Sequence, residues 1–360
     1  MKKIQKYYDI RDDMAKYPDA WCYIVWSKRG PGKTYSTLRM CIEDDKRFIF
    51  MKRTIEDVNL MCARMEDDPD SDVSPFKPLN TDMGWDIYPF LINNKGMAGF
   101  YHAEIGEDGK LHPVGKLLGW IIAVSAVAKF KGFSMSEADY LIFDEFIPKP
   151  YERVNRNEGD AVLDLYMTVS RDRVKRGRPE LKLILLANAT SIRNPMFDTM
   201  EITDIAAHMD IIGEEYEYLD DGTMLHAIPS SFDINDESKK TGIEKRMDGT
   251  AWASMAFGGK FGYDDFTSIG KVSLKGYRPI CSLKFKRSTY YLYNKEGEWY
   301  MCQSAQHTPV QYNLNLENDQ KLFFANHIIE LREACITGHM RFELYTMYDL
   351  IINYRKNFKI

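Results

Sequence analysis

Short, unbroken apolar runs recur through the first two thirds of the chain. They predict strands at residues 21–26, 47–53, 140–145 and 181–189. Runs without alternating polar positions are typical of strands buried on both faces of a mainly parallel sheet. Residues 35–42 and 159–170 have helical composition, so strands and helices alternate. This order predicts an α/β domain. Residues 85–100 and 119–128 are further predicted strands, and residues 211–218 are the expected edge strand.

The pattern changes near residue 235, where a charged and then glycine-rich stretch extends to residue 266. Such a composition predicts a connector with short helices. Strands are then predicted at 279–286, 289–294 and 299–304, followed by helices at 318–338 and 341–356. Strands followed by helices suit a small α/β or α+β domain. We therefore expect three segments: a domain at 1–234, a linker at 235–266 and a second domain at 267–360.

A glycine-rich loop follows the first predicted strand and precedes the first helix. Its residues are Ser27, Lys28, Arg29, Gly30, Pro31, Gly32, Lys33 and Thr34. The P-loop pattern GxxxxGK(S/T) cradles a polyphosphate with backbone N–H groups, lysine and a Mg²⁺-binding hydroxyl. Ser27 stands where glycine is expected, so we expect a compensating backbone geometry there. The alternative is a plain Gly/Pro turn. All eight residues are candidate nucleotide ligands, which makes ATP and Mg²⁺ the expected cofactors.

Two carboxylates, Asp144 and Glu145, end the predicted strand at 140–145. In P-loop ATPases with this Walker B pattern, the first acid holds the Mg²⁺ shell together with a P-loop hydroxyl, here Thr34. The second carboxylate orients and deprotonates the attacking water. A chance strand end is the alternative. Asn188 ends the strand at 181–189, where a side-chain amide can sense the γ-phosphate.

Two groups of cations have an open interpretation. Arg171 begins a stretch with five cations in residues 171–178. It is either a solvated basic turn or an arginine finger aimed at a γ-phosphate. Lys52 and Arg53 end the strand at 47–53, where solvent exposure is the stronger expectation over a functional role.

Composition limits the classes of protein. The 360 residues include 44% hydrophobic and 28% charged residues, as in ordinary folded proteins. No apolar run approaches 18 residues, so we expect no membrane span and an intracellular location. Six separated cysteines without a CxxC pair predict reduced thiols and no structural metal. The net charge is −5, yet residues 267–360 hold 13 Lys and Arg against 8 Asp and Glu. The C-terminal part is thus the better candidate for meeting a polyanion, and an ordinary, slightly basic surface is the alternative on charge alone.

Taken together, these motifs resemble those of the DNA-packaging motor ATPases of tailed bacteriophages, most closely the phi29-like, terminase-related packaging ATPases. The resemblance also rests on residues 48–53, 119–120, 171–173, 194–195, 248–250 and 338–342. It implies an ASCE-type P-loop ATPase in which Lys33 and Thr34 hold nucleotide and Mg²⁺, Asp144 supports the metal, and Glu145 is the catalytic base. It further implies that Arg171 and Lys131 act on the ATP of a neighbouring subunit, and that Asn188 couples hydrolysis to movement.

The resemblance also implies that residues 267–360 have an RNase H-like fold. An active nuclease of that kind holds two metals with a cluster of carboxylates. The predicted strand at 279–286 contains no acidic residue, and Glu330, Glu333 and Asp349 lie on predicted helices. We therefore expect a vestigial, non-cutting domain that binds DNA, RNA or the portal.

The expected function is that of an ATP-hydrolysing double-stranded DNA translocase that packages a viral genome. By the resemblance it works as a homopentameric ring at the procapsid portal, transiently, in the host cytoplasm, with a packaging RNA as a further candidate partner. One alternative is a terminase with an active endonuclease. Another is a nucleotide-gated assembly or binding protein without translocation.

Overall fold

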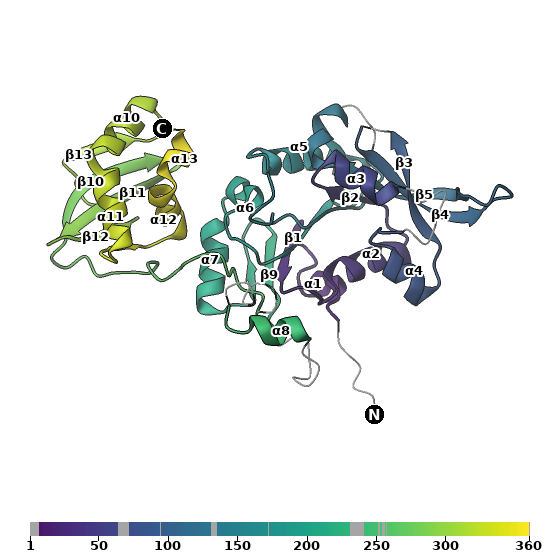
Figure 1. Cartoon of the computed structure of the whole chain (residues 1–360). Helices are drawn as coiled ribbons and strands as arrows, with labels where there is room; N and C mark the ends of the chain where they lie inside the picture. The colour runs from purple at the N-terminus through teal and green to yellow at the C-terminus, as the bar shows by residue number, and fades with distance from the viewer. Residues whose placement is uncertain are drawn as a thin grey trace. The chain divides into compact units, whose positions relative to one another are not determined.

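A computed structural model describes residues 7–63, 72–93, 95–130, 135–171, 173–230, 241–250, 253, 256 and 258–359. The chain divides into two compact units, drawn in Figure 1. The first contains Met1–Ile202 and Ile212–Asp264, and the second contains Thr203–Ile211 and Asp265–Ile360. The predicted division into an ATPase domain, a linker and a C-terminal domain stays a prediction.

The first unit is built on a nine-stranded sheet of order β3-β4-β5-β2-β6-β7-β1-β9-β8. Its strands are β1 Cys22–Ser27, β2 Phe48–Lys52, β3 Ile87–Asn93, β4 Met97–Ile105, β5 Leu111–Ala123, β6 Tyr140–Asp144, β7 Lys182–Asn188, β8 Tyr216–Tyr218 and β9 Thr223–Ala227. Neighbours from β5 to β9 run parallel, whereas β3, β4 and β8 pair antiparallel at the two edges. The prediction of a mainly parallel sheet in an α/β fold is confirmed.

Helices connect these strands. They are α1 Ile10–Lys16, α2 Lys33–Glu43, α3 Ile55–Cys62, α4 Lys77–Met83, α5 Glu158–Ser170, α6 Pro195–Met200, α7 Thr203–Ile212 and α8 Gly242–Met247, with 3-10 turns at Val124–Phe130 and Val174–Arg176. All of α7 except its last residue belongs to the second unit. All six residues of β1 are buried, as expected for an unbroken apolar run in a central strand. None of the helices in the described part of the chain is long and apolar enough to span a membrane.

The central strands carry their polar residues to one edge of the sheet. In the parallel register Ser27 of β1 lies opposite Asn188 of β7, and Asp144 of β6 lies opposite Leu186 of β7. Lys52 ends the next strand, β2. The carboxyl ends of parallel strands are where α/β sheets bind ligands.

Several predicted elements differ in the structure. The strand predicted at 85–100 is the antiparallel pair β3 and β4. The strand predicted at 119–128 is only the end of β5, because a 3-10 turn begins at Val124. The edge strand predicted at 211–218 is wrong at its start, where α7 continues to Ile212, and β9 was not predicted at all.

The second unit has a five-stranded sheet of order β13-β10-β11-β12-β14. Its elements are β10 Arg278–Phe285, β11 Ser288–Lys295, β12 Glu298–Cys302, β13 Val310–Asn313, α10 Glu317–Phe323, a π turn at Phe324–Ile328, α11 Ile329–Ile336, β14 Met340–Phe342, α12 Tyr345–Ile352 and α13 Tyr354–Phe358. The short strands β13 and β14 were not predicted. The helix predicted from 341 begins only at Tyr345, because β14 pairs with β12.

Candidate active site

The glycine-rich loop has the backbone that a phosphate-binding loop needs. Gly30 and Gly32 have φ values of 92° and 94°, a left-handed region that side chains rarely adopt. Gly32 is the N-cap of α2, so the first N–H groups of that helix face the loop. Ser27 does not take a left-handed conformation, because it is still a strand residue. The expected compensating geometry at Ser27 stays a prediction.

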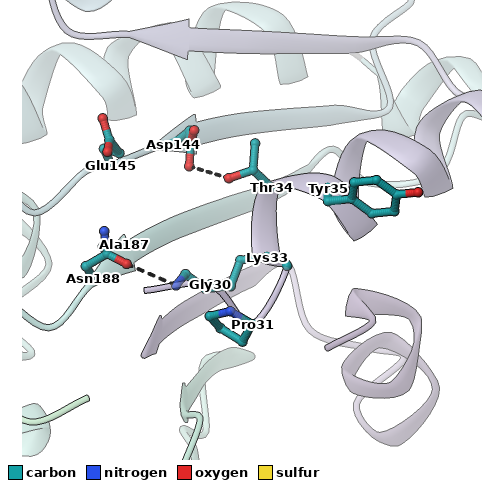
Figure 2. A pocket seen from close by; sticks show the side chains of 10 residues that line it. Gly30, Pro31, Lys33, Thr34, Tyr35, Asp144, Glu145, Ala187 and Asn188 are labelled. Carbon is teal, nitrogen blue, oxygen red and sulfur yellow. Dashed lines mark hydrogen bonds between the residues drawn. The ribbon is translucent and has the colours of Figure 1, made fainter. Parts of the chain in front are cut away.

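Lys33 is buried below this loop and held by neutral oxygens. Its Nζ donates to Ser27 Oγ and lies 3.4 Å from both Lys28 O and Asn188 Oδ1. Figure 2 shows the contact with Asn188 across the floor of the pocket. Desolvation lowers the pKa of the Lys33 amine to about 8, although the carboxylates Asp144 and Glu145 oppose this shift. The amine is thus positioned to receive an anion.

Thr34 and Asp144 meet on the opposite wall. Thr34 Oγ1 donates to Asp144 Oδ1 over 2.9 Å, so residues 110 positions apart form one oxygen pair (Figure 2). Among the described residues, no cluster of three or more His, Cys, Asp or Glu side chains could hold a metal. Mg²⁺ commonly takes only one or two protein oxygens and completes its shell with phosphate and water. The pair fits such an ion.

Glu145 follows in a strained conformation, with a φ of 58°. Such a backbone costs of order 1–3 kcal/mol and persists only where the surroundings fix it. Arg53 Nη2 donates to the carbonyl oxygens of Glu145 and Phe146, each over 3.0 Å. Phe146 N donates to Leu186 O over 3.2 Å. These bonds hold the turn that presents the exposed Glu145 side chain.

These residues line a pocket of about 270 Å³. Its lining residues are Gly30, Pro31, Gly32, Lys33, Thr34, Tyr35, Asp144, Glu145, Ala187 and Asn188. The structure thus brings together predicted residues from the ends of two strands, β6 and β7, and from the glycine-rich loop and the start of α2. Ser27, Lys28 and Arg29 do not line it. Its anion-binding helix terminus, amine and Thr–Asp oxygen pair match the chemistry of a Mg²⁺-polyphosphate.

A second cavity of about 450 Å³ shares Asp144 and Glu145 with this pocket. Lys52 Nζ lies 3.6 Å from Asp144 Oδ2. Arg53 forms ion pairs of 2.8 Å with Glu152 and with Glu158. The Lys52 and Arg53 side chains are only 21% and 13% exposed. The expectation that these two cations point into solvent is therefore wrong, because both meet carboxylates at the sheet edge.

The sequence model of the podovirus DNA encapsidation protein (Gp16) family matches residues 94–353. The chain belongs to this family. Its relatives include the DNA packaging protein of Bacillus phage B103, which is 32% identical over 244 residues, 64% of this chain and 70% of that protein. The DNA packaging protein of Bacillus phage phi29 is 28% identical over 253 residues, 67% of this chain and 72% of that protein.

Solved structures of packaging motors have the same fold. The chain of the bacteriophage phi29 viral genome packaging motor assembly matches with a TM-score of 0.66 and 21% identity, covering 98% of this chain and 99% of that one. The chain of the phi28 gp11 DNA packaging motor matches with a TM-score of 0.58 and 16% identity, covering 99% of each chain. The predicted resemblance to phage packaging ATPases is confirmed at the level of family and fold.

Arg171, one of the two predicted trans-acting residues of this encapsidation-family protein, does not line the pocket. Arg171 is exposed at the C-terminal end of α5 and lines neither cavity. Among the described residues it has no hydrogen-bond or ion-pair partner. Lys131 lies outside the described residues. The roles of both stay predictions.

Sequence reasoning missed the role of Arg173, the third residue of the same basic run. Arg173 is 2% exposed and pairs with Asp139 over 2.5 Å. Its guanidinium also donates to the carbonyl oxygens of Ser136, Ala138 and Pro179. Nothing in the run RDRVKRGR distinguishes a buried arginine from its exposed neighbours, because its partners are mostly backbone oxygens.

Proposed function

We propose that this chain is a Mg²⁺-dependent ATPase that drives double-stranded DNA into a viral procapsid. The observation that carries the proposal is the contact of Thr34 with Asp144 beside the buried Lys33, at the N-terminus of α2. Membership of a DNA encapsidation family supports the packaging role. The names of the relatives, DNA packaging proteins and packaging motors, support it further.

The chain's own residues would bind the triphosphate as follows. The first N–H groups of α2 and the Lys33 amine would take the phosphate oxygens. Thr34 and Asp144 would hold Mg²⁺, which when bound neutralises charge developing on the phosphates. Asn188 Oδ1 lies 3.4 Å from Lys33 Nζ, which supports a role for its amide in sensing the terminal phosphate.

Glu145 would act as the general base. Its carboxylate would orient the attacking water and accept a proton from it. The left-handed turn fixed by Arg53 and Leu186 directs this side chain to the end of the pocket shared with the second cavity. A fixed turn suits a base that must stay within hydrogen-bond reach of a water molecule.

Arg171 would complete the ATP site of a neighbouring copy. It has no hydrogen-bond or ion-pair partner among the described residues of its own chain and does not line the described pocket. An arginine that acts in trans requires a ring, and the family resemblance suggests a pentamer at the procapsid portal. Lys131 is proposed as a second trans-acting cation, and a packaging RNA as a further partner.

Two substitutions test the nucleotide site. We expect Lys33→Ala to abolish ATP binding, because the amine is the cation held beneath the loop. Glu145→Gln should keep ATP affinity and stop turnover, because only the base is lost. Equilibrium binding of a fluorescent ATP analogue and steady-state phosphate release measure the two effects. Near-native turnover by Glu145→Gln would show that the base is misassigned.

A mixing experiment tests the shared site. Arg171→Ala and Glu145→Gln should each be inactive alone, with turnover lowered by roughly 10³-fold or more for the arginine. In a mixed ring, some sites combine an intact Glu145 with an intact Arg171 from the neighbour, so ATPase activity should return. Mixtures that co-assemble and stay inactive would contradict an arginine acting in trans.

The alternative functions make different predictions. A nucleotide-gated binding protein would hydrolyse ATP slowly and without stimulation by DNA and procapsids. A terminase with an active endonuclease would need metal-binding carboxylates in the second unit. The eight residues of β10 contain none.

A further inference from the structure

A segment near the end of the first unit lies against the start of the glycine-rich loop. It consists of Ala256 and residues 258–264, and we call it the strap. Arg29 N donates to Ala256 O over 3.2 Å, so the loop and the strap share a backbone hydrogen bond. Phe261 anchors the strap, because its ring is 2% exposed and lies 5.8 Å from the ring of Trp26 in β1. The strap is thus fixed to the strand from which the loop emerges.

Gly259 brings the strap into direct contact with the backbone of the loop. Its φ is 69°, and a Cβ atom at this position would lie 2.9 Å from the backbone nitrogen of Lys28. The same Cβ atom would lie 3.4 Å from the carbonyl carbon of Ser27. Backbone atoms cannot move aside as the end of a flexible side chain can, so the approach requires glycine. Gly259 therefore packs on the peptide that joins Ser27 to Lys28.

The Lys28 carbonyl group carries this contact to the amine of the pocket. Lys28 O accepts from Ser27 Oγ over 2.6 Å and lies 3.4 Å from Lys33 Nζ. A carbonyl oxygen at this place favours the charged form of a buried amine. Ser27 and Lys28 do not line the pocket, whereas Lys33 does. The strap therefore acts on the Lys33 amine through the backbone of Lys28.

The far end of the strap holds the loop that follows β7. The carboxylate of Asp264 accepts from Ile192 N over 2.8 Å and from Ser191 Oγ over 3.4 Å. Asn188, which lines the pocket, is the last residue of β7 and precedes this loop. Asp264 N donates to Phe261 O over 3.1 Å, so this end is bonded to the buried anchor. The strap therefore connects two chain segments that lead into the nucleotide pocket.

We infer that the strap is a positioning element of the nucleotide site. Gly259 sets the Lys28 carbonyl oxygen against the Lys33 amine, and Asp264 holds the loop that follows Asn188. The inference deepens the proposed function and rests on it, because it identifies what keeps the phosphate-binding loop in its binding conformation. A loop that already has this conformation loses little conformational entropy when the nucleotide binds.

The strap should affect the binding of ATP more than its hydrolysis. Glu145, the proposed general base, is held separately, because its turn is fixed by Arg53 and Leu186. Loosening the strap should therefore raise KM for ATP and leave kcat nearly unchanged, as expected when an interaction equal in the ground and transition states is lost. A general loss of structure would lower kcat and the melting temperature as well.

Gly259→Ala in the full chain tests the contact with the loop. We expect the dissociation constant of a fluorescent ATP analogue, and KM for ATP, to rise about tenfold, the value of one hydrogen bond to a charged group. The value of kcat at saturating ATP should stay within about twofold of the wild-type value. Native affinity of the Gly259→Ala protein would overturn the inference, and so would a loss that falls on kcat alone.

Two neighbouring glycines provide matched controls. Gly249 has a φ of 76°, so Gly249→Ala introduces the same backbone strain, but no atom lies within 4 Å of its Cβ position. Gly258→Ala changes the residue next to Gly259, also into open space. Both control proteins should bind ATP as the wild type does. A loss of affinity in Gly249→Ala as large as in Gly259→Ala would overturn the inference, because strain alone would then explain the effect.

Asp264 gives a test that leaves the backbone of the strap unchanged and stands even where Gly259→Ala does not fold. Asp264→Ala should weaken binding of the ATP analogue about fivefold, because Ile192 N loses its acceptor. Asp264→Asn keeps an oxygen for this bond and should recover most of the affinity. Equal losses in the two proteins, or none in Asp264→Ala, would contradict a positioning role of this hydrogen bond.

Combining Gly259→Ala with Asp264→Ala tests whether the strap acts as one piece. The double variant should lose about as much affinity as the weaker-binding single variant, because each change already releases the strap. Losses that multiply would show two independent effects and overturn the inference. A wild-type chain that binds the analogue and never hydrolyses ATP would instead refute the proposed function, since the affinity measurements need no turnover.

Discussion

At the scale of single residues, the Lys33 amine makes ATP binding depend on pH. Burial lowers its pKa to about 8, whereas an unfolded lysine titrates near 10.5. A bound polyphosphate favours the protonated amine. We therefore expect ATP affinity to be constant below pH 8 and to fall above it, by at most about tenfold per pH unit. Calorimetry in two buffers of different ionisation enthalpy should detect proton uptake on binding at pH 9.

The same amine makes the stability of the fold rise with pH, whereas ATP affinity falls with pH. Between about pH 8 and 10.5 the unfolded chain binds more protons at this position than the folded chain does. The contribution of Lys33 to the free energy of unfolding should therefore increase as the pH rises through this window, which makes the folded state more stable. Lys33→Met, which lacks the amine, should remove this pH dependence of stability. An unchanged affinity profile in wild-type protein would contradict the buried position of the amine.

The sequence predicts best the residues whose chemistry depends on strand ends. Asp144 and Asn188 lie in one pocket because parallel strands deliver their carboxyl-terminal residues to one edge, and Thr34 reaches Asp144 from the start of α2. The burial of the Arg173 side chain and the left-handed backbone of Glu145 could not be predicted from the sequence. The first depends on carbonyl groups distant in sequence, and the second on a left-handed φ in a residue type that rarely adopts one.

At the scale of elements, the N-terminal helix is fixed by a buried carboxylate. Asp13 of α1 accepts hydrogen bonds from Tyr8 OH at 2.7 Å, Tyr216 OH at 3.2 Å and His226 Nδ1 at 2.8 Å. Tyr8 N in turn donates to Pro31 O over 2.9 Å. The network therefore links the edge strands β8 and β9 to the glycine-rich loop.

We expect Asp13→Ala to lower the free energy of unfolding by about 2–4 kcal/mol, because buried donors would lose their acceptor. Asp12→Ala is the matched control, since Asp12 is the exposed neighbour and should change stability by less than about 0.5 kcal/mol. Urea denaturation measures both. Equal effects of the two substitutions would contradict the importance of the network.

The basic turn after α5 separates a structural arginine from an exposed one. Arg173→Ala should cost about 2–4 kcal/mol of stability, because three carbonyl groups lose their donor. Arg171→Ala should leave stability within about 0.5 kcal/mol while lowering turnover. Thermal melting with parallel ATPase assays distinguishes the two. A loss of stability in the Arg171→Ala protein would contradict the exposed, unpaired position of the Arg171 side chain.

Short elements were the hardest to predict. β13 and β14 have four and three residues, too few to show a periodicity. β5 has 13 residues, and its first half is largely exposed in a hairpin with β4. The polar residues of that half interrupt the apolar run from which a buried strand would be predicted. The long buried strands were predictable because their burial on both faces requires unbroken apolar runs.

At the scale of the whole molecule, the second unit should bind nucleic acid without cutting it. β10 has no acidic residue, and the described residues contain no cluster of three metal-binding side chains. The excess of five positive charges in residues 267–360 favours salt-dependent binding to a polyanion. We expect the full chain to leave supercoiled plasmid intact in Mn²⁺. Nicking above the background of plasmid incubated with Mn²⁺ alone would refute the vestigial assignment.

The position of β1 in the sheet also affects how the protein is made. Its partners β7 and β9 end at residues 188 and 227, whereas β1 itself ends at Ser27. A ribosome adds about 5–20 residues per second, so the strand that leads into the glycine-rich loop waits roughly 10–40 s for its second partner. During that time the six residues of β1, all of which are buried in the native sheet, are exposed on the nascent chain. Synthesis of this protein should therefore depend on chaperones that bind nascent chains, and fragments ending before residue 223 should aggregate.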